Sequence, residues 1–155
     1  MNNTNLNNPN TLPVDLIQNL VDNYRNNQLD CINQNMAMDD AHSVWFDLPT
    51  LKSFIAEIET QALTIDPNVE NEDLGIRFYY AAYPTTPVQP IPSNYAKRHT
   101  LVMIPTKKEG GLNYDFNPFE EDEKALAVTG ITPKVALAQN HGDLVPPGAS
   151  IVESY

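Results

Sequence analysis

The stretch LGIRFYYAAY, residues 74–83, decides the fold of this chain. Apolar side chains occupy every second position, and a period of two is the pattern of a β-strand with one apolar face. The apolar set is Leu74, Ile76, Phe78, Tyr80 and Ala82. We therefore predict a long strand here and work outward from it.

A second strand is predicted over HTLVMI, residues 99–104. It is apolar on both faces for several residues, which favours a central strand covered by helices on at least one side. Between the two strands, four prolines within 84–92 exclude a central strand and predict a long exposed loop. Residues 108–111 read as a glycine turn, so residues 112–116 would return as the second half of a hairpin.

Two amphipathic helices complete the main pattern. Residues 49–63 place apolar side chains on one stripe, and Asp47 is suited to cap the helix that begins at Leu48. A second helix is predicted from about 13 to 27, while residues 26–38 are polar and predict a loop or a short helix. Residues 43–46 form a short β-type run. Residues 125–128 predict a short helix start, and residues 140–148 predict a loop-rich C-terminus.

Together these elements predict one domain. Residues 1–11 are rich in Asn and are expected to form a flexible tail, and residues 12–155 a single α+β domain. We expect a small, mainly antiparallel sheet, including the strand around Val44, that packs against the N-terminal helix and the helix at 49–63. The side chains expected in its core are Trp45, Phe46, Phe54, Ile58, Phe78 and Val102.

The net charge limits the classes of partner that the protein is expected to bind. Nine Lys and Arg residues against twenty Asp and Glu residues give a net charge of -11, which repels nucleic acid and anionic membranes. Cys31 is the only cysteine, so the chain has no internal disulfide framework and no zinc site with two thiolates. No signal-peptide pattern or membrane-spanning apolar run occurs in the sequence. We expect a cytoplasmic protein.

Standard catalytic, metal and cofactor motifs are absent from the sequence. His42, His99 and His141 do not have metal-ligand spacing, and Cys31 has no neighbouring base that would lower its pKa. The chain also lacks a glycine loop of the kind that cradles phosphate. We therefore predict neither a metal nor a cofactor.

Polar and aromatic side chains on the second face of the 74–83 strand form the first candidate site. Arg77, Tyr79 and Tyr83 alternate outward, and Arg98 and His99 begin the other strand. If the strands are neighbours, this set could bind an anion or a small ligand, because Arg offers a bidentate fork and Tyr a rigid wall. The alternative is a structural cross-strand network in which Arg77 pairs with an acidic side chain.

The stretch NHGDLVPP, residues 140–147, is the second candidate. His141 lies between an amide and the carboxylate of Asp143 in a glycine-containing loop, which is suited to acid–base chemistry. The same residues are also ordinary turn formers, and a histidine in such a loop can simply cap backbone groups.

Four blocks together resemble a family of small uncharacterised bacterial proteins, a domain of unknown function. The blocks are DAHSVWF (40–46), LGIRFYYA (74–81), RHTLV (98–102) and NHGDLVPP (140–147). The resemblance covers about residues 12–148 and implies an α+β fold without an assigned activity, substrate or catalytic residue. Family members usually carry a cysteine just before the final Pro-Pro, where this chain has Val145.

Two functions follow as hypotheses. The first is a non-enzymatic binding or protein-interaction module, whose partner is another protein, a second copy of the chain or a small ligand. The second is a small enzyme or ligand-binding protein that uses an Arg/His/Asp cluster. A pocket that encloses two or more of Arg77, His99, His141 and Asp143 would favour a ligand site.

Overall fold

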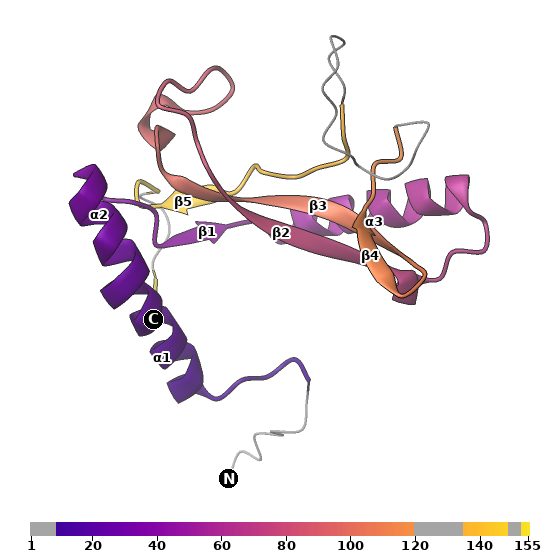
Figure 1. Cartoon of the computed structure of the whole chain (residues 1–155), viewed down its shortest axis with the longest axis horizontal. Coiled ribbons are helices and arrows are strands. Elements are labelled where there is room, and N and C mark those ends of the chain that lie inside the picture. Colours follow the sequence, from indigo (N-terminus) through magenta and orange to yellow (C-terminus); the bar gives the residue numbers. More distant parts are fainter. Residues whose placement is uncertain (1–8, 120–134, 149–152) are drawn as a thin grey trace.

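The computed structural model describes residues 9–119, 135–148 and 153–155 (Figure 1). Its elements are helices and a small antiparallel sheet, so the predicted α+β class is confirmed. Most of the Asn-rich tail and the helix start predicted at 125–128 lie outside the described residues. None of the described helices is both long and apolar enough to cross a membrane.

The main sheet has three antiparallel strands in the order β2-β3-β4. They are β2 (Leu74–Ala82), β3 (His99–Glu109) and β4 (Leu112–Asp115). The central position predicted for the 99–104 strand is confirmed, and so is the hairpin, in which Glu109 pairs with Leu112. Gly110 and Gly111 form its turn with φ of 57° and 81°, a conformation that favours glycine.

The strand around Val44 does not belong to this sheet. It is β1 (Ser43–Trp45), which pairs antiparallel with β5 (Asp143–Val145) in a separate two-stranded ribbon. The prediction of one sheet was therefore wrong on this point, and the loop-rich C-terminus contains a strand. The ribbon forms because Leu144 is fully buried, and the backbone N–H of His42 donates to the carbonyl of Val145 at 2.6 Å.

The predicted amphipathic helix is α3 (Leu48–Ile65), which lies behind the three-stranded sheet in Figure 1. Asp47 is its N-cap and accepts hydrogen bonds from the hydroxyl and the backbone N–H of Thr50, which lower the pKa of Asp47. Phe54 and Ile58 on its buried stripe pack against Met103 of β3. This cluster is the apolar core beneath the sheet.

The N-terminal helix is longer than predicted. It runs through α1 (Val14–Asn23), a π-helical turn (Tyr24–Leu29) and α2 (Asp30–Met36), and ends at Ala37 with φ of 50°. Amide side chains stabilise the polar second half of this helix. Asn27 and Asn35 each donate a hydrogen bond to the backbone carbonyl four residues earlier. No residue of α1 is buried, so the expectation that this segment packs against the sheet was wrong for α1.

The predicted core is correct in part. Phe54 and Ile58 are buried and Phe46 and Val102 are half-buried, but Trp45 is 49% exposed and Phe78 54% exposed. The predictions for Trp45 and Phe78 were wrong. The core beneath the sheet includes Leu74 and Ile76 of β2, but neither Phe78 nor Trp45 belongs to a core cluster.

The exposed loop after β2 is confirmed and contains a short 3-10 turn (Ser93–Tyr95); another such turn (Asn71–Asp73) precedes β2. Tyr83, expected to point outward, is buried instead. It packs with Ala41 and Leu144 because it follows the end of the strand.

Candidate functional site

A pocket of about 210 Å³ lies between the loop after β2 and the segment before β5. We call it the tyrosine pocket. It is lined by Tyr83, Pro90, Ile91, Pro92, Tyr95, Asn140, His141, Gly142 and Asp143. Three of the residues singled out in the sequence, Tyr83, His141 and Asp143, are therefore brought together in one pocket.

Two aromatic rings form its fixed wall. The ring centroids of Tyr83 and Tyr95 are 5.5 Å apart and their planes are inclined by 39°. The hydroxyl of Tyr83 donates to Oδ1 of Asn140 at 2.9 Å, and Nδ2 of Asn140 donates to the carbonyl of Leu101 at 2.6 Å. These bonds tie the pocket to β3, so its aromatic wall is held in place before any ligand arrives.

Gly142 allows the pocket loop to lie against β1. A Cβ atom at this position would be 2.5 Å from Cγ1 of Val44 and 2.7 Å from Cζ of Phe46, which is closer than real side chains approach. Only glycine fits this close approach without moving its neighbours. The position of His141 and Asp143 on either side of Gly142 therefore depends on the packing of the β1–β5 ribbon.

His141 and Asp143 each have a side-chain atom that can accept a hydrogen bond. Oε1 of Gln139 accepts from the backbone N–H of His141 at 2.8 Å and also lies 2.6 Å from Nδ1. Because an amide oxygen cannot donate, Nδ1 of the neutral ring carries the proton and Nε2 keeps its lone pair. The Tyr95 hydroxyl accepts from the backbone N–H of Leu144 at 3.2 Å and lies 3.5 Å from Oδ1 of Asp143.

Arg77 and Tyr79 lie in a different place. Both contact the carboxylate of Asp115 on β4, and Arg77 also donates to the carbonyl of Asn113 at 2.9 Å. The hydrogen bond to Tyr79 and the charge of Asp115 raise the pKa of Arg77. The cross-strand network in which Arg77 pairs with an acidic side chain is thus confirmed.

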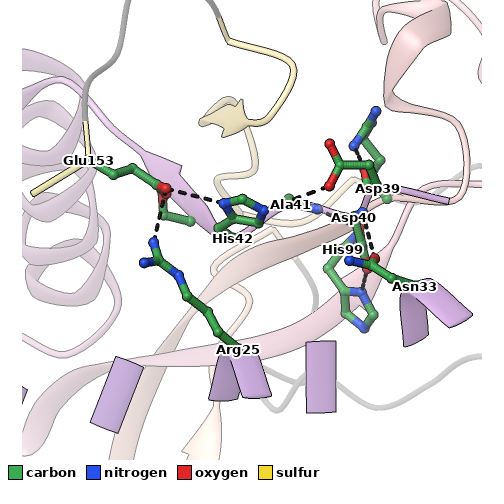
Figure 2. Close-up of polar contacts among 10 residues, drawn as sticks. Arg25, Asn33, Asp39, Asp40, Ala41, His42, His99 and Glu153 are labelled. Carbon is green, nitrogen blue, oxygen red and sulfur yellow. Dashed lines mark hydrogen bonds and ion pairs between the residues drawn. The ribbon is translucent and has the colours of Figure 1, made fainter. Parts of the chain in front are cut away.

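His99 is bonded to a carboxylate that the sequence analysis did not single out. Asp40 is completely buried and accepts from the backbone N–H groups of Ala41 and His99, each at 2.7 Å. Its second oxygen contacts Nδ1 of His99, as Figure 2 shows. The backbone N–H of Asp40 donates to Oδ1 of Asn33 at 2.8 Å, so this contact joins α2 to the start of β3.

Glu153, which is also drawn in Figure 2, is another carboxylate that sequence reasoning missed. It accepts from Arg25 at 3.0 Å, from Nδ1 of His42 at 3.2 Å and from the hydroxyl of Ser43 at 2.5 Å. Burial would raise the pKa of Glu153, but the hydrogen bonds from Ser43 and His42 and the charges of His42 and Arg25 together lower it. These partners are more than a hundred positions away, so no local sequence pattern predicts them.

Other candidate sites are weaker. Within the described part of the chain, no three His, Cys, Asp or Glu side chains are grouped as metal ligands would be. A wider groove of about 550 Å³ lies beside the start of α3, and Glu57 is the one ionisable side chain among its described lining residues. The tyrosine pocket is therefore the best-defined site in the described residues.

Comparisons with family models, curated proteins and solved structures find no match to this chain. The resemblance to a family of small bacterial proteins therefore stays a prediction.

Proposed function

We propose that this protein is a non-enzymatic binding module whose tyrosine pocket holds a cationic group, the ammonium of a lysine or the guanidinium of an arginine. The observation that carries the proposal is the pairing of two tyrosine rings with acceptor atoms of His141 and Asp143 in one pocket. Aromatic faces attract cations, and a carboxylate and an imidazole nitrogen accept their N–H groups.

Charge and size support this ligand class. The chain carries a net charge of -11, which raises the local concentration of cations and repels anions. At about 210 Å³ the pocket is smaller than the roughly 300–1,000 Å³ of sites for drug-sized molecules. A single side chain of a partner protein fits this scale, and we place the interaction in the cytoplasm because the lone cysteine offers no disulfide.

The enzyme alternative has less support. Among the described contacts, His141 and Asp143 share a pocket, whereas His99 is bonded to Asp40 and Arg77 to Asp115. A cluster that needs all of them would require both of these contacts to break. We therefore keep the binding module as the proposed function.

An NMR titration tests the proposal with N-acetyl-lysine amide as the probe. We expect backbone signals around 140–143 and Tyr95 to shift. Asp143→Asn should weaken binding about tenfold, because it removes the charge of a hydrogen-bonded acceptor. Asp15→Asn is the matched control, since it removes the same charge from the exposed surface of α1.

Further probes separate the sources of the cation. The Nε-acetylated form of the same probe lacks the charge, and binding as strong as that of the parent would contradict the proposal. n-Butylammonium represents a free amine, and a lysine flanked by other residues in a short peptide represents a protein partner. Tighter binding of the peptide is the result expected for an interaction module.

A further inference from the structure

The exposed edge of the three-stranded sheet is independent of the tyrosine pocket. β2 is the outer strand in the order β2-β3-β4, and no described strand pairs with its outer edge (Figure 1). Its sequence, LGIRFYYAA, contains no proline, lysine or acidic residue. Natural proteins usually protect long edge strands with such residues, because an open edge pairs with other chains.

The register of the sheet identifies which backbone groups are free. Met103 exchanges hydrogen bonds of 2.9 and 3.0 Å with Gln139, so its N–H and C=O point away from β2. Phe78 is the register partner of Met103, and in an antiparallel pair its N–H and C=O must therefore point outward. Because backbone direction alternates along a strand, the N–H and C=O groups of Ile76, Tyr80 and Ala82 point outward as well. No described residue forms a hydrogen bond with these outward groups of Phe78, Ile76, Tyr80 or Ala82.

The side chains at the middle of this strand are large and aromatic. Phe78 is 54% exposed, and its neighbours Tyr79 and Tyr80 are 42% and 91% exposed. At about 200 Å² for each aromatic side chain, the three expose on the order of 350 Å². That is close to half of the roughly 800 Å² that each partner buries in a standard interface, and the strand backbone adds to it.

We propose that a second copy of this chain pairs with β2 in an antiparallel arrangement, with the two-fold axis at Phe78. Phe78 is the middle residue of the nine-residue strand, so this register sets the outward backbone groups of residues 76–80 opposite those of the second copy. Ile76 then lies opposite Tyr80 of the second copy, and the two sheets join into one of six strands. The interface is isologous, as in most soluble homodimers.

The charge on β2 is compatible with a second copy of the chain at its outer edge. Arg77 is the one charged residue of β2, and the register places it opposite Tyr79 of the second copy. Within its own chain, the guanidinium of Arg77 already lies 6.0 Å from the centre of the Tyr79 ring, the geometry of a cation–π contact. Although each copy carries a net charge of -11, no carboxylate of the strand meets another across the axis.

Two variants with opposite charges at position 78 test whether the two-fold axis passes through this residue. Sedimentation equilibrium of the full chain should give a dimer, and Phe78→Lys and Phe78→Glu should each weaken dimerisation on the order of 100-fold, because like charges face each other. A one-to-one mixture of the two variants should restore the dimer. The matched controls, Leu112→Lys and Leu112→Glu, change an equally exposed side chain of β4 and should leave the dimer intact.

Tyr80→Pro gives a second test in case the charged variants fail to fold. Proline removes the outward N–H at position 80 without touching the hydrogen bonds to β3, so we expect a folded monomer. A monomeric wild-type chain would overturn the proposal, as would a dimer that survives both charges at position 78. If the one-to-one mixture of the two charged variants fails to form a dimer, the two-fold axis does not lie at Phe78 and the proposal is also overturned.

Discussion

The middle and the start of β3 are held in place by different kinds of interaction. Midway along β3, Phe54 and Ile58 of α3 pack against Met103, and the contacts are apolar. Where β3 begins, the buried carboxylate of Asp40 bonds His99, and Asn140 bonds Leu101. The apolar contact depends on area removed from water, whereas the polar contacts depend on donors and acceptors being matched.

The largest effect in this comparison is expected at the apolar contact. Ile58→Ala should lower the free energy of unfolding by about 3–4 kcal/mol, because it leaves a cavity between α3 and Met103. Ile55→Ala, on the exposed face of the same helix, is the control and should cost much less. Urea denaturation measures both, and similar losses for the two variants would contradict the packing described for α3.

This apolar contact is the part of the fold that the sequence predicts well. Phe54 and Ile58 fall on one helical stripe and Asp47 is a recognisable cap, so periodicity and capping rules place α3 correctly. Trp45 and Phe78 show the limit, since periodicity gives the face of a strand but not whether anything covers it. That depends on which elements pack on each face, since Ile76 of β2 joins the core and Phe78 of the same strand does not.

The next largest effect is expected at the polar contact. Asp40→Asn should lower the free energy of unfolding by about 2–3 kcal/mol, because an amide offers one acceptor where the carboxylate serves three N–H groups. Asp39→Asn is the control, as it removes the same charge from a neighbouring side chain that is 69% exposed. The same urea experiment measures this pair. Equal small losses would show that Asp40 is not the anchor of His99.

The polar contacts at the start of β3 could not be predicted from the sequence, and the reason is physical. Asp40 and His99 are separated by 59 positions, and Asn140 and Leu101 by 39. No periodicity connects such pairs, because the fold alone brings them together. The candidate site was predictable to the extent that it is local: His141 and Asp143 lie in one stretch, whereas Tyr83 and Tyr95 reach the pocket through the loop after β2.

The smallest expected effect is a dependence on pH at Glu153, which fastens the C-terminal residues to the N-terminal helix and to His42 and Ser43. Its pKa in the folded protein lies below the ordinary value of 4.5. The unfolded chain therefore binds a proton at a higher pH than the folded chain does. The stabilising contribution is fully present above about pH 4.5 and is lost as the pH falls through the lowered pKa.

Glu153→Gln isolates this contribution, because every other carboxylate is common to the variant and the wild-type chain. We expect the variant to be less stable at pH 7, and the difference in free energy of unfolding to shrink as the pH is lowered below about 4.5. Urea denaturation at a series of pH values measures this difference. A difference that stays constant with pH would mean that Glu153 acts through its shape and not its charge, since a neutral glutamine has no proton to gain.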